Sequence, residues 1–311
     1  MISKLKKLAK RIPVSFLLFG TYRMLRYSKK SQKLQIKYPL KILNSYESVN
    51  YIEKGNFSVG RFGDGEFDLM FDGRENIGFQ KNDQSLVEAL FFILRNPKPN
   101  FVIGLPYMFV DVRGFKFWVS SAWRYYNTKF LRPVANIIDN ENLYVATGFT
   151  RPYFEYKDLE YTKKIIDSYS KLWKNKNILI VEGESTRFGV GNSLLTDAKN
   201  IKRILAPSEN AWSKKNKLKE HVLEYLKDKN YDDWVILIAL GPTATVLAYE
   251  LSDYVQCIDA GHMDLHFEYF SHHSKKVEKI EGKYANEAID GQTVDSIYDE
   301  KYIEQIIDVI K

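Results

Sequence analysis

Between residues 177 and 261 the chain alternates short apolar segments with longer charged or amphipathic ones. The apolar segments are NILIVEG, IKRILAP, WVILIALG and VQCIDAG, and each has the length of one buried strand. The stretches at 214–229 and 243–253 have helical spacing. Strands that are apolar on both sides and joined by helices form parallel sheets that are covered on both faces. The sequence therefore predicts an α/β fold with a mostly parallel sheet and helices on both faces.

The remaining predicted elements are less regular. Strands are expected at 57–62, 101–105 and 143–147, and helices at 40–54, 83–95, 115–126, 159–173 and 301–310. We divide the chain into a basic N-terminal helical extension (1–38), one α/β domain (39–274) and a C-terminal helical tail (275–311). We assign no chemistry to the tail.

The net charge of +7 is unevenly distributed along the chain. Residues 1–41 hold twelve Lys and Arg and no acidic residue, so the other 270 residues have a net charge of −5. An acidic body argues against nucleic acid as a partner. The single cysteine, Cys257, excludes an intramolecular disulfide and favours a reducing compartment, so we expect a cytoplasmic protein.

Residues 1–30 interleave basic and apolar side chains. Their longest uncharged run, 12–22, has eleven residues, whereas a membrane-spanning helix needs about 20. The pattern is typical of an amphipathic segment lying on an anionic membrane, here the inner face of the plasma membrane. A helix packed on the body, with a solvated basic face, explains the same pattern equally well.

Polar residues follow several of the predicted strands. The carboxyl ends of parallel strands meet at one edge of a sheet, where α/β proteins bind ligands. One such loop, RFGDGE, places Arg61 beside Asp64 and Glu66, and another, at 189–192, reads GVGN. Glycines let a backbone approach a phosphate closely. The GVGN segment is neither a Walker A loop nor a dinucleotide fingerprint, and an ordinary turn into a helix explains it as well.

The segment DAGHMDLHFEYF (259–270) is rich in potential metal ligands. It holds Asp259, His262, Asp264, His266 and Glu268 within ten residues. Asp and His at alternate positions can converge on a divalent cation if the segment is extended or turning. Oxygen ligands favour Mg²⁺ or Mn²⁺, and added imidazole shifts the preference toward Mn²⁺.

Five segments together resemble the GT-D type glycosyltransferases. They are RFGDGE, VEGE with the following GVGN, the run from Arg203 to Trp212, ALGPTATVLAYEL, and IDAGHMD followed by Glu268. The resemblance implies a Rossmann-like core, a UDP-sugar donor and Mn²⁺ or Mg²⁺ as cofactor. It also implies transfer of a hexose, glucose in the known case, to a glycan acceptor in cell-surface polysaccharide or glycoprotein synthesis. A lipid-linked acceptor would match a basic segment at the membrane.

The resemblance also implies roles for individual residues. Asp264 with His262 or His266 is expected to hold the metal, although Asp64 and Glu66 match the Asp-x-Glu pattern of the family. The candidate bases are Asp64, Glu66 and Glu268. The expected nucleotide-sugar-binding residues are Arg61, Gly63, Glu184, Arg187, Gly189, Gly191, Asn192, Ser208, Asn210, Trp212, Gly241 and Thr243. His266 stands where similar sequences carry Glu, so a catalytically inactive nucleotide-sugar-binding subunit is the alternative.

Overall fold

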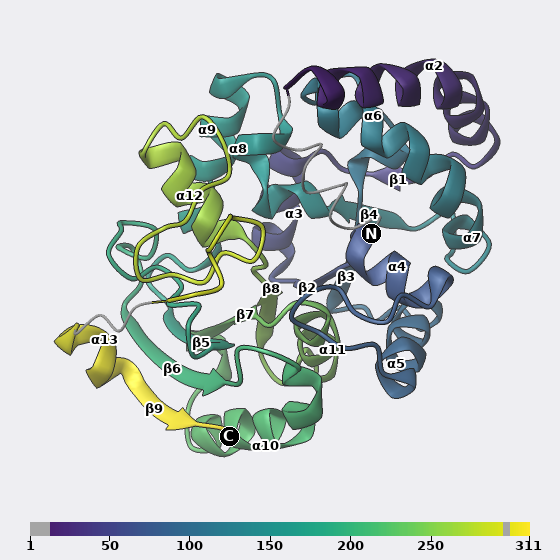
Figure 1. Cartoon of the computed structure of the whole chain (residues 1–311). Coiled ribbons are helices and arrows are strands. Elements are labelled where there is room, and N and C mark those ends of the chain that lie inside the picture. Colours follow the sequence, from purple (N-terminus) through teal and green to yellow (C-terminus); the bar gives the residue numbers. More distant parts are fainter. Residues whose placement is uncertain (1–12, 295–298) are drawn as a thin grey trace.

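The structure is a computed structural model, and it describes residues 13–294 and 299–311. In this part of the chain nine strands form one sheet, and every pairing between strands is parallel (Figure 1). The strand order is β1-β4-β3-β2-β8-β7-β5-β6-β9. The strands are β1 (Lys41–Ile42), β2 (Ser58–Arg61), β3 (Phe101–Leu105), β4 (Leu143–Ala146), β5 (Asn177–Gly183), β6 (Asn200–Ala206), β7 (Trp234–Ala239), β8 (Gln256–Asp259) and β9 (Ile306–Val309).

The central strands are buried because their side chains are apolar on both faces. In β7 all residues from Trp234 to Ile238 are buried, and β5 is buried from Ile178 to Gly183. This burial needs helices on both sides of the sheet. The predicted α/β class with a parallel sheet is confirmed.

The helices divide between the two faces of the sheet (Figure 1). On one face α11 (Pro242–Leu251) contacts β2, β7 and β8, with α5 (Gln84–Arg95) and α10 (Lys215–Leu226) beside it. On the other face α3 (Ser45–Gly55) lies over β4 and contacts α9 (Leu159–Asp167). The other helices are α2 (Pro13–Lys37), α4 (Asp64–Asp72), α6 (Phe117–Tyr126), α7 (Arg132–Ala135), α8 (Pro152–Glu155), α12 (Met263–Ser271) and α13 (Glu300–Gln305).

The N-terminal helix α2 packs on α6 and on the π-helical turn η2 (Asn127–Leu131). Gly20 allows the close approach, because a Cβ there would lie 2.5 Å from the ring of Phe117. The buried hydroxyl of Ser31 accepts a hydrogen bond from Asn127 Nδ2 (3.0 Å). Part of the basic extension is therefore a docked helix, and residues 1–12 of the extension lie outside the described residues.

The end of the chain differs from the prediction. A helix at 301–310 was expected, but α13 ends at Gln305 and β9 then pairs with β6 at the edge of the sheet. Isoleucine and valine dominate this last segment, and β-branched residues favour a strand where a sheet edge is available. The polar tail thus contributes the ninth strand.

Candidate active site

A cavity of about 600 Å³ opens at the carboxyl ends of the strands. The loops after β2, β4, β5, β6, β7 and β8 contribute to its wall, as the switch-point rule for parallel sheets predicts. The helix α6 and the segment 277–287 of the tail close its other sides. Of the predicted site residues, the wall includes Arg61, Gly63, Asp64, Glu66, Ser208, Gly241, His262 and Asp264.

Arg61, at the end of β2, is held by Asp259, at the end of β8. Its Nη2 donates to Asp259 Oδ1 (2.9 Å), its Nε to the Asp259 carbonyl (3.1 Å) and its Nη1 to Thr150 Oγ1 (2.9 Å). Gly261 makes room for the guanidinium, since a Cβ there would lie 1.9 Å from Arg61 Nη2. Arg61, an expected nucleotide-sugar-binding residue, is thus held in place in the cavity wall, with its charge shared with Asp259.

Three carboxylates gather beside this arginine. Asp64 and Glu66 lie in the first turn of α4, where the helix dipole favours negative charge, and Glu66 Oε2 accepts from the Gly63 amide (2.8 Å). Burial raises the pKa of Glu66 to about 7, and burial opposed by Arg151 raises that of Glu155 to about 7. Burial also raises the pKa of Asp64, although its side chain remains open to the cavity. Glu66 and Glu155, with pKa values of about 7, can accept or donate protons near neutral pH.

Arg151 is the second cation of the cavity wall. Its Nη1 and Nη2 donate to the two carboxylate oxygens of Glu287 (2.9 Å each), and its Nε lies 3.3 Å from Glu155. Burial raises the pKa of Glu287, but the Arg151 guanidinium outweighs this effect and holds it below the usual range. The fork-to-fork pair links the loop after β4 to the C-terminal tail.

His262 is neutral and fully engaged. Its Nδ1 lies 3.0 Å from Arg151 Nη1, and because a guanidinium can only donate, Nδ1 accepts this hydrogen bond. The ring proton is therefore on Nε2, which donates to Asn286 Oδ1 (3.2 Å). Burial and the Arg151 charge lower the pKa of His262 to about 4. Both ring nitrogens therefore have partners at neutral pH.

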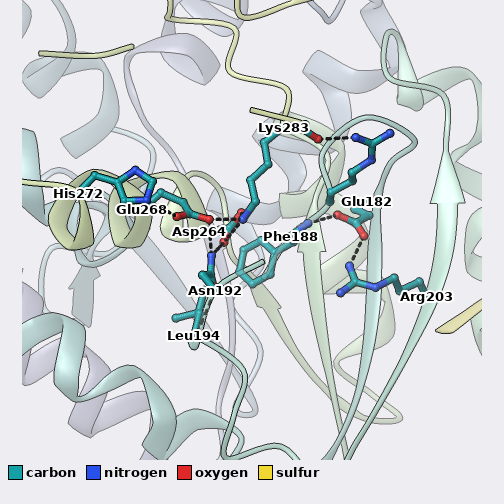
Figure 2. Close-up of polar contacts among 11 residues, drawn as sticks. Glu182, Phe188, Asn192, Leu194, Arg203, Asp264, Glu268, His272 and Lys283 are labelled. Atoms are coloured by element: carbon teal, nitrogen blue, oxygen red, sulfur yellow. Dashed lines mark hydrogen bonds and ion pairs between the residues drawn. The ribbon is translucent and has the colours of Figure 1, made fainter. Parts of the chain in front are cut away.

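The segment after β8 is helical and not extended. Asp264 and Glu268 are one turn apart on α12 and share a face, whereas His266 projects to the other side, where its ring meets Phe154 and Tyr269. The condition for convergence of alternate residues, an extended or turning segment, is therefore not met. Figure 2 shows the buried Nζ of Lys283 between the carboxylates, 2.7 Å from Asp264 Oδ2 and 2.7 Å from Glu268 Oε1.

Asn192 joins the same cluster. Its Nδ2 donates to Asp264 Oδ1 and to Glu268 Oε1, both at 2.7 Å (Figure 2). The nearby Arg187 donates to the Gly282 carbonyl (2.7 Å). Asn192, expected at the nucleotide, thus contacts α12, and the preceding Arg187 contacts the C-terminal tail.

The donor chemistry permits a divalent cation at Asp264 but not a full protein cage. Among the described residues no three His, Cys, Asp or Glu side chains form a group that could hold a metal ion. Mg²⁺ and similar ions often need only one or two carboxylates when substrate phosphates complete the shell. Asp264 is in the cavity wall and fits that role, while His262 is engaged and His266 points elsewhere.

Other predicted residues lie behind or beside the cavity wall. Thr243 is fully buried at the start of α11. Asn210 accepts from Gln80 Nε2 (2.7 Å) in the loop before α5, and Trp212 Nε1 donates to Ser85 (2.9 Å) in the first turn of α5. The remaining predicted residues outside the wall are Glu184, Arg187, Gly189, Gly191, Asn192, His266 and Glu268.

The sequence interpretation missed several residues of the site. Arg151 and Glu155 follow β4, and the strand-end rule could have found Arg151. Lys283, Asn286 and Glu287 come from the polar tail, which has no periodic pattern that signals them. The aromatic residues of α6 were assigned to a helix but not to the cavity.

A parallel α/β sheet with strand-end glycines, carboxylates and guanidinium groups around one cavity is the arrangement of an α/β enzyme that binds its ligand at the carboxyl edge of the sheet. Within that class, a family model described as "Glycosyltransferase GT-D fold" matches residues 59–288, and the chain belongs to this family.

Curated relatives agree with this assignment. Glycosyltransferase GlyD of Streptococcus pneumoniae serotype 4 is 32% identical over 263 residues, which cover 84% of this chain and 31% of the relative. A probable glycosyl transferase, Gly, of Streptococcus gordonii is 32% identical over 270 residues, covering 86% of this chain and 38% of the relative. The chain thus spans only about a third of the length of these relatives.

Solved structures share the fold. A protein described as a new glycosyltransferase (domain of unknown function 1792) from Streptococcus sanguinis has a TM-score of 0.79 and 31% identity, and the match covers 88% of this chain and 100% of that one. A structure of the same domain, described as having a distinct glycosyltransferase fold, has a TM-score of 0.81 and 30% identity, with 89% and 98% coverage.

Proposed function

We propose that the protein transfers a hexose, with glucose as the first candidate, from a UDP-sugar to a glycan acceptor of the cell surface. The observation that carries this proposal is the placement of Asp64 and Glu66 in one cavity with the strand-end glycines Gly183 and Gly241. Glycines let a diphosphate approach the backbone, and a carboxylate beside it can accept the proton of an incoming hydroxyl. Membership of a glycosyltransferase family supports the proposal.

Asp64 is the proposed general base because its carboxylate is open to the cavity. In a direct displacement, the acceptor oxygen bonds to C1 of the hexose while the bond from C1 to the UDP oxygen breaks. The hydroxyl proton passes to Asp64, and UDP leaves with the bonding electrons. Arg61 and Arg151 lie in the same wall, where positive charge stabilises the negative charge that develops on the diphosphate. Glu66 shapes this site by capping α4 at Gly63.

The proposal includes a divalent cation, Mn²⁺ or Mg²⁺, bound with the donor. Such a cation supplies further positive charge at the leaving diphosphate. Asp264 is the residue that would hold it, and Asp264 would then share its negative charge between Lys283 and the cation. Lys283 and Asn192 keep the Asp264 carboxylate in position.

The test is a thermal-shift panel of UDP-sugars with and without Mn²⁺, followed by an assay of UDP release. A bound donor raises the melting temperature of the native state. We expect stabilisation by at least one UDP-hexose, a larger rise with Mn²⁺, and UDP release that EDTA abolishes. Robust release in EDTA would contradict the role of the cation. Binding without turnover on any acceptor would indicate a binding subunit instead.

We further propose that the acceptor is lipid-linked and that the protein contacts the inner face of the plasma membrane through its N-terminal segment. The outer side of α2 supports this, because Leu18, Leu25 and Ile36 are exposed there by 66%, 81% and 75%. Exposed Lys and Arg side chains, including Lys29 and Lys33, flank these apolar residues. Such a surface suits an anionic bilayer. No helix in the described ranges is long and apolar enough to cross a membrane.

A further inference from the structure

The cavity has two unlike walls. The ends of β5, β6 and β7 and the loops after them form one of them, which includes the small residues Gly183, Ser208 and Gly241. The helix α6 forms the other wall. Its residues at the cavity are Trp118, Val119, Ala122, Trp123 and Tyr126.

These α6 residues occupy one face of the helix. Their spacing of i, i+1, i+4, i+5 and i+8 is that of a single helical face. The opposite face is the one that packs on α2, where Phe117 meets Gly20 and the ring of Tyr125 lies 5.3 Å from that of Tyr27. Packing against α2 therefore does not explain the aromatic residues on the cavity face.

The aromatic wall combines rigid and open side chains. Trp123 is buried and meets Phe109 edge-on at 5.8 Å, and Tyr126 stacks on Phe130 at 5.8 Å. Trp118 stands beside them with 43% of its surface exposed. An indole left open inside a cavity is an apolar platform with a polar N–H at its edge. A pyranose ring has matching chemistry, because it presents an apolar C–H face and hydroxyl groups around its rim.

The wall also lies next to the proposed base. Asp64 and Tyr126 both line the cavity, and burial, together with the smaller effect of the negative charges of Asp64 and Asp68, raises the pKa of Tyr126. Asp64 thus lines the same cavity as the aromatic wall and the glycine-lined wall.

We propose that the cavity face of α6 is the acceptor subsite, where Trp118 stacks on a pyranose ring of the acceptor glycan and turns its hydroxyl toward Asp64. This inference rests on the proposed glycosyl transfer. It assigns the glycine-lined wall to the donor and the aromatic wall to the acceptor. The helix α2 packs on the face of α6 opposite the cavity. The proposed acceptor subsite on α6 and the proposed membrane surface on α2 therefore lie on two helices in contact.

The test compares Trp118→Ala with Trp118→Tyr and with Tyr254→Ala, which removes a 50% exposed aromatic side chain outside the cavity wall. The probes are octyl β-glycosides of glucose, galactose and N-acetylglucosamine, and the readout is UDP release with and without each glycoside. We expect Trp118→Ala to raise the acceptor KM at least tenfold, while the UDP-induced melting shift persists. Trp118→Tyr restores most of the acceptor affinity, and Tyr254→Ala changes none of these values.

Other results would overturn the assignment. An unchanged acceptor KM in Trp118→Ala would show that the indole does not bind the acceptor. If Trp118→Ala lost the UDP-induced melting shift as well as acceptor affinity, the donor would bind at this wall instead. Wild-type protein that releases UDP but responds to none of the glycosides would also count against a sugar-binding wall. Wild-type protein that releases no UDP from any UDP-hexose would be a failure of the proposed function itself.

Discussion

Replacing Glu66 by Gln should raise the free energy of unfolding at pH 8 and leave it unchanged at pH 4.5. Burial raises the pKa of Glu66 from 4.5 to about 7, so the fold disfavours its charged form. At about 1.36 kcal/mol for each pKa unit, the shift corresponds to roughly 3 kcal/mol. Solvent in the cavity screens part of this effect, and we therefore expect about 1–2 kcal/mol.

The sign follows from linkage. Below pH 4.5 the carboxyl group is neutral in both the folded and the unfolded state, so it has no effect. Between pH 4.5 and about 7 the unfolded state ionises first, which lowers the free energy of unfolding of the wild type. The glutamine of the variant cannot ionise, while its side-chain oxygen can still accept from the Gly63 amide. The difference between the two proteins therefore grows through this pH window and is constant above it.

The assay is urea-induced unfolding of both proteins at pH 4.5, 6 and 8. The exposed Glu220, replaced by Gln, serves as the matched control and should show no comparable pH-dependent gain. A Glu66→Gln variant that is destabilised equally at all three pH values would refute the reasoning. It would show that the carboxylate is stabilised in the fold by its neighbours.

Three further predictions concern other parts of the molecule. Lys283→Met should lower the free energy of unfolding by about 3–5 kcal/mol, because it leaves Asp264 and Glu268 as uncompensated buried charges. Chemical unfolding measures this loss. The control is Lys275→Met, at an exposed lysine, which should have little effect. Gly241→Ala should lower the melting temperature and weaken UDP binding by thermal shift, because the backbone φ is 56° and a Cβ would lie 2.3 Å from Phe79; an unchanged melting temperature would count against it. Replacing the three exposed α2 residues described above, Leu18, Leu25 and Ile36, by Ser should lower partitioning onto phosphatidylglycerol vesicles at least tenfold; unchanged cosedimentation would end the membrane proposal.

Local pattern was sufficient to predict most of the fold. The four apolar segments after residue 177 became β5, β6, β7 and β8 because buried parallel strands leave a continuous apolar signal. The last strand was missed because Ile306–Val309 is short and gains its partner, β6, from a distant part of the chain. A strand at a sheet edge depends on that partner more than on its own pattern.

The sequence predicted those site residues that directly follow a strand, because the ends of parallel strands meet at the cavity. Asp64 and Glu66 follow β2 and do line the cavity. The spacing of Asp264 and His266 suggested convergence, but the helix begins at Met263 and separates them. Lys283 was missed because a single lysine in a polar tail carries no local signal, and its role appears only when the tail folds back onto α12.

The most direct test of glycosyl transfer is UDP release from UDP-hexoses by the wild type, Asp64→Asn and Tyr254→Ala, measured with the octyl glycosides and Mn²⁺. We predict acceptor-dependent release by the wild type and Tyr254→Ala, and loss of at least a hundredfold in Asp64→Asn, since general-base catalysis contributes about 10²–10⁴-fold. The UDP-induced melting shift should persist in Asp64→Asn. Undiminished release by Asp64→Asn, or no release by the wild type from any UDP-hexose, would contradict the account.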